Sequence, residues 1–324
     1  KACKITNIRK GRKKSGLAAQ HLTGIKALAE ICDAEVKGAQ LGSTEVEFTP
    51  GNLKPGSYSF DVGTAGSVSL VLQGLMIPSA GHKFEFAIKG GTDVAWSPTT
   101  NYIRTVFGSF MRQMGIEFEI KTTKHGFYPK GGGEATIKTG NAQWNQLNLT
   151  ERGAPIRTDA HSFASSDLKA AKVSDRQLEG AKLVENLNIK DNGYVNSFST
   201  GSSINLHTHF ENTVLGASAL GERKKPAEDV GKEAATLLNK QLQTKACLDE
   251  WMTDQIIPYM AITATKATKK ENEHPKDVSS VVSVAEITKH CLTNIWVTEK
   301  FLPVEFKIKG KQEKPGIISV RKKE

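Results

Sequence analysis

Apolar side chains along this chain follow two spacings, and stretches with one spacing alternate with stretches that have the other. Leu22, Ile25, Leu28 and Ile31 lie three residues apart, which is the spacing of one buried helix face. Alternation of apolar and polar residues, as in Lys83–Lys89, is instead typical of a strand. Aligned along the chain, these runs repeat as β-α-β-α-β-β with a period of about 80 residues. The pattern predicts an α/β (α+β) protein of three repeated units, the first of them truncated.

Each unit is defined by the helices and strands that the pattern predicts. The first unit contains one helix, Leu17–Cys32, and strands at Lys4–Arg9, Ala34–Ala39 and Glu45–Phe48. The second contains helices Gly66–Pro78 and Asn101–Met114, and strands Tyr58–Val62, Lys83–Lys89, Glu117–Thr122 and Glu134–Thr139. The third contains helices Asp249–Ala264 and His290–Phe301, and strands Ser279–Val284, Val304–Lys309 and Ile317–Lys322.

The pattern changes within residues 153–244, where polar stretches surround one predicted strand, Ser203–Phe210, and one predicted helix, Ala227–Leu242. We interpret this stretch as a small α/β domain inserted into the third unit. The sequence therefore predicts two domains: a repeated-unit domain made of residues 1–152 together with 245–324, and the inserted domain between them.

The charge balance narrows the class of partner. Lys and Arg number 44 against 34 Asp and Glu, which gives a net charge of +10 and a pI near 9.3. Such a balance fits a polyanionic partner, most commonly nucleic acid. The lysine-rich segment Lys266–Lys276 is then either a solvated loop or an RNA contact.

Cysteine spacing and hydropathy indicate where the protein works. The four cysteines are widely scattered without metal-ligand spacing, so we expect reduced thiols. No apolar run approaches the roughly 20 residues of a membrane span, and no signal peptide is present. We expect an intracellular protein with no membrane partner. Because Lys4–Ile8 already resembles a strand in mid-domain and Lys1 is not methionine, we also expect a further N-terminal segment.

Two histidines lie near the N-terminal ends of predicted helices. His21 and His290 are each followed by a threonine and an apolar run of helical character. At a helix N-terminus, free backbone N–H groups and the positive dipole end favour anions. The alternative is that either histidine caps a helix or packs in a core. Ile8–Gly16, just before His21, carries five cations in a glycine-containing turn that suits a phosphate monoester, unless it is only a solvated loop.

Further loops are candidates for ligand contact. The glycines of His125–Gly133 allow a tight bend, either for a ligand or as a purely structural turn. Gly63–Ser67 and Gly90–Asp93 lie beside predicted element ends, where open α/β sheets place ligands. Trp251 and Gln255 lie four apart on one helix face, and an aromatic plane beside an amide can hold a purine.

Together these stretches resemble the RNA 3′-terminal phosphate cyclases, and the likeness runs nearly from end to end. The matching stretches are Ile8-Arg9, Gly11-Arg12, Gly16-Leu17, Gln20-His21-Leu22, Leu41-Gly42-Ser43-Thr44, Thr64-Ala65-Gly66-Ser67, Gly90-Gly91-Thr92, Tyr128-Pro129-Lys130-Gly131-Gly132-Gly133, Asp254-Gln255, and His290 with Thr293. The enzymes of the family carry the histidine before the last helix, whereas a noncatalytic cyclase-like branch does not retain it. His290 therefore indicates the enzyme branch.

The resemblance implies an RNA-processing, ligase-type reaction. ATP would adenylate His290, the adenylate would pass to an RNA 3′-phosphate, and the neighbouring 2′-hydroxyl would close a 2′,3′-cyclic phosphate and expel AMP. A divalent cation, Mg²⁺ or another, would assist. The implied ATP-binding residues are Gln73, Pro98, Trp251, Asp254 and Gln255, and those implied to bind the RNA phosphate are Arg9, Arg12, Gln20 and His21. The eukaryote-like character of the resemblance leads us to expect nuclear localisation.

The chain departs from the family pattern at three places. Trp251 stands where the family usually has tyrosine, which keeps the stacking plane without the hydroxyl. Lys10 and Ser15 replace the usual alanine and proline of the basic loop. The family's Asp-Gly…Glu-Gly-Gly-Gly-Gln segment, with a following active-site arginine, is absent. Two functions remain as alternatives to a cyclase. The first is a noncatalytic RNA-binding or ribosome-assembly factor on the same scaffold. The second is an enolpyruvyl transferase, which the basic loop and the single set of repeats disfavour.

Overall fold

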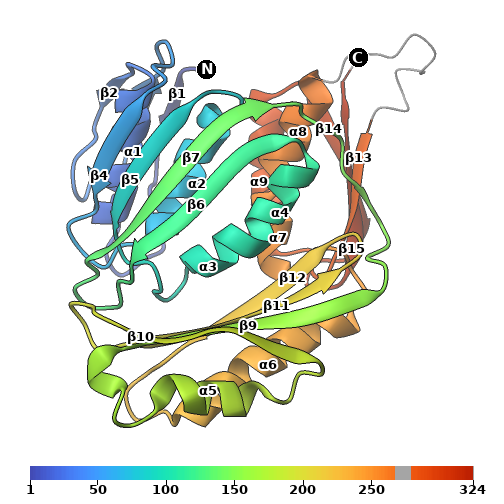
Figure 1. Ribbon diagram of the computed structural model, residues 1–324. Coiled ribbons are helices and arrows are strands. Elements are labelled where there is room, and N and C mark those ends of the chain that lie inside the picture. The colour runs from blue at the N-terminus through green and yellow to red at the C-terminus, as the bar shows by residue number, and fades with distance from the viewer. Residues whose placement is uncertain (267–278, 324) are drawn as a thin grey trace. The chain divides into compact units, whose positions relative to one another are not determined.

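The computed structural model describes residues 1–266 and 279–323, so the lysine-rich segment lies outside the described residues from position 267 on (Figure 1). Helices and several sheets alternate along the chain, and the α/β class is confirmed. The chain divides into two compact units. The first consists of Lys1–Thr100, Glu119–Asn141 and Asn196–Ser199, and the second of Asn101–Phe118, Ala142–Val195 and Thr200–Glu324.

The first unit contains a small antiparallel sheet of order β1-β3-β2 and most of a four-stranded sheet of order β4-β5-β7-β6. In β5 the side chains alternate, so that Phe84, Phe86 and Ile88 are buried. Helix α2 packs against β5 and also against α1. The elements are β1 (Cys3–Ile5), α1 (Ala19–Ile31), β2 (Glu35–Lys37), β3 (Val46–Thr49), β4 (Ser57–Asp61), α2 (Val68–Ser79), β5 (Phe84–Gly90), β6 (Ile116–Lys124) and β7 (Gly133–Ala142).

Two helices that the sequence predicted as continuous are interrupted. The run predicted at Asn101–Met114 contains a π-helical turn, η1 (Ile103–Phe107), between α3 (Thr100–Tyr102) and α4 (Gly108–Gln113). The run predicted at Asp249–Ala264 breaks at Ile256 into α7 and α8. Pro258 explains this second break, because proline has no N–H to donate and fits the first turn of a new helix. The bounds are α7 (Glu250–Gln255) and α8 (Ile257–Lys266).

A second four-stranded sheet, of order β14-β15-β13-β8, has the same topology as the β4–β7 sheet. In each, the first two strands are parallel and the second pairs antiparallel with the last. Its elements are β8 (Asn148–Leu149), β13 (Ser279–Val284), α9 (Lys289–Phe301), β14 (Val304–Gly310) and β15 (Gly316–Lys322). The shared topology agrees with a repeated unit, while the full set of three repeats stays a prediction.

The remaining sheet, of order β10-β9-β11-β12, lies within the stretch predicted as an insertion. Helices α5 and α6 cover one of its faces (Figure 1). Ala160, Ile204, Leu206 and Ala217 belong to the core on that side. The elements are β9 (Pro155–Ser165), η2 (Ser166–Leu168), α5 (Val173–Ala181), β10 (Leu187–Val195), β11 (Ser202–Phe210), β12 (Val214–Leu220) and α6 (Ala227–Gln243). The domain boundaries stay a prediction, because the two compact units are divided elsewhere in the chain.

Candidate functional site

His290 lies in the first turn of α9, in the second unit. Thr288 caps this helix, and its side-chain oxygen accepts a hydrogen bond from the backbone N–H of Cys291 at 3.0 Å. The imidazole is exposed. It therefore sits at the positive end of the helix dipole, where a phosphate is favoured. The sequence prediction that this histidine begins a helix is confirmed.

Helix α7 brings Asp254 near His290. The side-chain amide of Asn294 on α9 donates to the carbonyl oxygen of Asp254 at 2.9 Å, which ties the two helices together. Burial raises the pKa of Asp254, and the charge of His290 opposes this rise. The structure thus brings together two residues that the sequence places 36 positions apart, a histidine and a carboxylate.

Gln255 and Trp251 lie one turn apart on α7. The Gln255 Nε2 donates to the carbonyl oxygen of Trp251 at 2.9 Å. Its Oε1 is buried and has no hydrogen-bond partner among the described residues. A buried acceptor without a partner costs about 1–3 kcal/mol. An N–H donor from a ligand, such as a purine amine, would satisfy it. The Trp251 indole is half-buried and meets the Tyr102 ring edge-on, with centroids 6.4 Å apart.

Asp249 holds the start of α7. It is fully buried, and its Oδ1 accepts hydrogen bonds from the Tyr102 hydroxyl at 2.6 Å and from the Met252 backbone N–H at 2.8 Å. Burial raises its pKa to about 6, while these hydrogen bonds act in the opposite direction. Sequence reasoning missed this residue. The available signal was an aspartate as the first residue of the predicted helix Asp249–Ala264, because aspartate is favoured at the N-cap position.

The basic loop lies in the first unit. The predicted strand Lys4–Arg9 was wrong in its second half, because only β1 forms and the chain then turns. Arg9 Nη1 donates to the carbonyl oxygen of Gly16 at 3.0 Å and so closes the loop. Gly16 has φ +78°, and a Cβ there would lie 2.0 Å from the carbonyl oxygen of Gly42. Arg12 is exposed, and its side chain forms no ion pair with any residue that the structure describes.

Gln20 and His21 occupy the first turn of α1, beside the start of α2. The Gln20 Oε1 accepts from the Ser67 backbone N–H at 3.3 Å. The His21 Nδ1 accepts from the Ala18 backbone N–H at 3.3 Å. Burial lowers the pKa of His21, and the nearby charge of Arg9 lowers it further. Two helix N-termini and the basic loop therefore converge, which favours an anion.

The two remaining candidates, Gln73 and Pro98, also belong to the first unit. Gln73 lies in the middle of α2 and is half-buried. The carbonyl oxygen of Pro98 accepts from Ser69 Oγ, and Ser69 Oγ in turn lies 2.8 Å from Ser67 Oγ. The loop carrying Pro98 is thus linked to the start of α2. The role of Gln73 and Pro98 in ATP binding stays a prediction.

The RNA 3′-terminal phosphate cyclase family model matches residues 1–308. A protein with that name from Pyrococcus furiosus is 41% identical over 99% of this chain and 91% of its own length. Its namesakes from Methanosarcina barkeri and Methanopyrus kandleri are each 38% identical, over 98% of this chain and 90% of their own. The chain belongs to the RNA 3′-terminal phosphate cyclase family.

The glycine-rich turn that marks a cyclase has a structural role here. Gly131 and Gly132 have φ of +67° and +70°, which only glycine adopts freely. A Cβ on Gly132 would lie 2.1 Å from the Phe198 ring. The Lys124 ammonium sits 3.7 Å from the centroid of that ring, and Ser199 Oγ accepts from the Lys130 backbone N–H at 3.0 Å. The turn thus anchors the loop at Asn196–Ser199.

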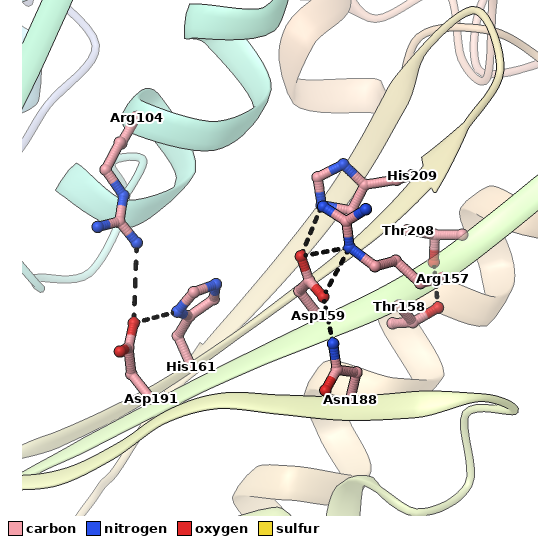
Figure 2. Close-up of polar contacts among 9 residues, drawn as sticks. All are labelled: Arg104, Arg157, Thr158, Asp159, His161, Asn188, Asp191, Thr208 and His209. Atoms are coloured by element: carbon pink, nitrogen blue, oxygen red, sulfur yellow. Dashed lines mark hydrogen bonds and ion pairs between the residues drawn. The ribbon is translucent and has the colours of Figure 1, made fainter.

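A polar cluster on the β10-β9-β11-β12 sheet was not predicted (Figure 2). His161 Nδ1 lies 2.5 Å from Asp191 Oδ2, and His209 Nε2 lies 3.0 Å from Asp159 Oδ2. Arg104 and Arg157 complete the two ion-pair groups. Among the described residues no group of His, Cys, Asp or Glu has the geometry to hold a metal ion. The cluster pairs histidine and arginine side chains with two aspartates on this sheet.

His207 lies between these two groups on β11. It is completely buried, its ring centroid is 5.6 Å from that of His161, and neither ring nitrogen has a hydrogen-bond partner in the described part of the chain. Burial lowers its pKa well below the ordinary value, and the neighbouring histidines and Arg104 act in the same direction. The imidazole is therefore neutral at pH 7.

Two sequence expectations concern location. Within residues 1–266 and 279–323, no helix combines the length and apolar character that crossing a membrane requires. The relatives named above come from archaea, which have no nucleus, so the comparisons lend no support to nuclear localisation.

Proposed function

We propose that this chain is an ATP-dependent RNA 3′-phosphate cyclase. The observation that carries the proposal is the exposed imidazole of His290, which lies in the first turn of α9 near Asp254. Family membership and the near-complete alignment with cyclases support it. An exposed histidine at a helix N-terminus can present a neutral ring nitrogen to a phosphate that the helix dipole attracts.

The reaction then proceeds in three displacements. A ring nitrogen of His290 attacks the α-phosphorus of ATP, an N–P bond forms, and pyrophosphate leaves. An oxygen of the RNA 3′-phosphate next attacks the same phosphorus, and the bond to His290 breaks. The adjacent 2′-hydroxyl finally attacks the 3′-phosphate, loses its proton and expels AMP. The relay places AMP, a good leaving group, on the RNA 3′-phosphate, whose own oxygens leave very poorly, and so divides one difficult step into easier ones.

The base of ATP would lie along α7. The buried Oε1 of Gln255 has no partner among the described residues and would accept a hydrogen bond from the adenine amine. The half-buried Trp251 indole would stack on the ring, and Asp254 would face the nucleotide beside His290. The family resemblance implies that Gln73 and Pro98 are also ATP contacts.

The RNA 3′-phosphate would bind in the first unit. Arg9 and Arg12 supply cations, and Gln20 and His21 lie in the first turn of α1. Burial and the charge of Arg9 both lower the pKa of His21 in the ligand-free protein, whereas the negative charge of a bound phosphate would raise it. A phosphate monoester needs several donors at once, and this convergence supplies them.

A divalent cation would neutralise the triphosphate. Mg²⁺ typically keeps several waters and binds through one or two carboxylates together with substrate phosphates. Such a site does not need the preformed cluster that is absent from the described residues. The carboxylate of Asp254, near His290, has suitable chemistry to take part.

Cyclisation of a defined oligonucleotide tests the proposal. An RNA with a labelled 3′-phosphate is incubated with protein, ATP and Mg²⁺, and the product is treated with phosphatase. We expect label that resists phosphatase with the wild type and loses that resistance in His290→Ala. Tight binding of the RNA by a folded wild type that gives no resistant label would instead identify a noncatalytic RNA-binding protein.

A further inference from the structure

Asp249 connects three separate elements of the second unit. Its Oδ1 accepts hydrogen bonds from the Tyr102 hydroxyl at 2.6 Å and from the backbone N–H groups of Trp251 and Met252 at 3.1 and 2.8 Å. Its Oδ2 accepts from the backbone N–H of Gly216 at 2.9 Å. The two backbone donors in α7 make Asp249 the N-cap of that helix, whereas Tyr102 and Gly216 lie far away in the sequence.

The two distant donors are themselves held firmly. Gly216 lies on β12, the outer strand of the β10-β9-β11-β12 sheet, opposite His207 of β11. A Cβ on Gly216 would lie 2.7 Å from a methyl carbon of Val106 and 3.1 Å from the Tyr102 ring. The strand therefore packs closely against Val106 of the π-helical turn and against Tyr102, and both Gly216 and Tyr102 donate hydrogen bonds to the Asp249 carboxylate.

Helix α7 transmits this position to the proposed ATP site. It is only six residues long, so its N-terminal turn sets the place of every side chain on it. Trp251 follows Asp249 by two residues and touches the Tyr102 ring edge-on. Gln255 hydrogen-bonds back to Trp251 at 2.9 Å. Asp249 itself is fully buried.

We propose that Asp249 is a positioning residue through which the β10-β9-β11-β12 sheet and Tyr102, the last residue of α3 before the π-helical turn, fix α7 in the place that nucleotide binding requires. The sheet predicted as an insertion then contributes to nucleotide binding, because it aligns the ATP-binding helix. This inference rests on the proposed function, since it takes Trp251, Asp254 and Gln255 of α7 as ATP contacts.

Asp249→Asn distinguishes positioning from simple capping. Asparagine caps helices about as well as aspartate, so α7 keeps its N-cap. With the amide oxygen in the place of Oδ1, the amide nitrogen faces the N–H of Gly216, and two donors then oppose each other. The variant thus breaks only the tie to β12. Tyr102→Phe removes the hydrogen bond from the Tyr102 hydroxyl to Asp249, and it serves as the second variant if Asp249→Asn fails to fold.

The matched control is Asp175→Asn. Asp175 also accepts a hydrogen bond from a tyrosine hydroxyl, that of Tyr194 at 2.7 Å, and it lies on α5, which packs against α6 and the strands of its own sheet. Two readouts are needed for all three variants. The first is the ATP dependence of His290 adenylation in the full chain, together with the affinity for RNA bearing a 3′-phosphate. The second is amide hydrogen exchange of the peptide covering Glu250–Gln255, measured without nucleotide.

We expect Asp249→Asn to raise the KM for ATP about five-fold or more, since opposing a buried donor with another donor costs far more than a weakened hydrogen bond. In Asp249→Asn the affinity for RNA stays at the wild-type value and the α7 amides exchange faster. Tyr102→Phe changes the KM for ATP and the amide exchange in the same direction as Asp249→Asn. Asp175→Asn leaves both unchanged. Wild-type ATP dependence in a folded Asp249→Asn variant, with or without faster exchange, overturns the inference. If the wild type itself does not adenylate, the proposed function fails, and exchange alone decides whether Asp249 positions α7.

Discussion

The buried oxygen of Gln255 gives a prediction in which stability and binding change in opposite directions. The perturbation is Gln255→Met, which nearly conserves volume and deletes both polar atoms. In the free protein it removes an acceptor that has no partner in the described part of the chain, which relieves about 1–3 kcal/mol. It also deletes the hydrogen bond to the carbonyl oxygen of Trp251, worth about 0.5–1.5 kcal/mol.

The free protein should therefore be as stable as the wild type, or up to about 2 kcal/mol more stable. Nucleotide binding should weaken by about 1 kcal/mol, or five-fold, because the adenine amine loses its acceptor. Urea unfolding without nucleotide measures the first quantity. Calorimetric titration with α,β-methylene-ATP, whose α–β bridge does not break, measures the second.

Gln177→Met is the control, for which we expect the reverse of the Gln255→Met result: lower stability and unchanged nucleotide affinity. The Gln177 Oε1 accepts from Ser162 Oγ and its Nε2 donates to Ser202 Oγ, both at 2.8 Å, and the side chain is fully buried. Its loss should destabilise the protein by about 1–3 kcal/mol without changing nucleotide affinity. If Gln255→Met instead destabilises the free protein by a similar amount and binds nucleotide as the wild type does, Oε1 is a structural atom and the argument fails.

Three other residues give predictions of their own. Gly16→Ala should lower the free energy of unfolding in urea by about 2 kcal/mol or more, because its Cβ meets the carbonyl oxygen of Gly42. Gly24→Ala in α1 is the control. Since it has open space around it, it should be neutral or stabilising by about 0.5–1 kcal/mol. The affinity for 3′-phosphate RNA should fall as the salt concentration rises. Arg12→Ala should reduce by about 1 the slope of the logarithm of the binding constant against the logarithm of the salt concentration. An unchanged slope would place Arg12 outside the phosphate contacts. The pKa of His207 is depressed in the folded state, so the unfolded chain binds more protons and stability should be lost as pH falls through and below about 6.5. His207→Phe should flatten this acid side of the stability profile, and an identical profile in the variant would refute the assignment.

The sequence correctly predicted the features that depend on neighbouring residues, such as helix starts and turns. Both histidines were expected at helix starts, and α1 and α9 place His21 and His290 in their first turns. The basic run within Ile8–Gly16 likewise lies in a turn, as its glycines indicated. Such features depend on spacing and capping within a few residues, which a sequence displays directly.

Contacts between distant segments could not be predicted in this way. The Tyr102 hydroxyl and the Asp249 carboxylate are 147 positions apart, and nothing in either neighbourhood refers to the other. The π-helical turn depends on tertiary packing around Phe107, and helical periodicity alone predicts an uninterrupted helix there. Strands β9 and β10 were missed because their polar residues gather in the cluster on one sheet face, which hides the apolar alternation (Figure 2).

Covalent labelling with α-labelled ATP asks directly whether His290 is the nucleophile. Protein and Mg²⁺ are incubated with the nucleotide, and the wild type is compared with His290→Ala after denaturing electrophoresis. We predict label on the wild type alone, released by acid and stable to alkali, as expected of a phosphoramidate on His290. A folded wild type that takes no label, or equal label on His290→Ala, would contradict the proposed mechanism.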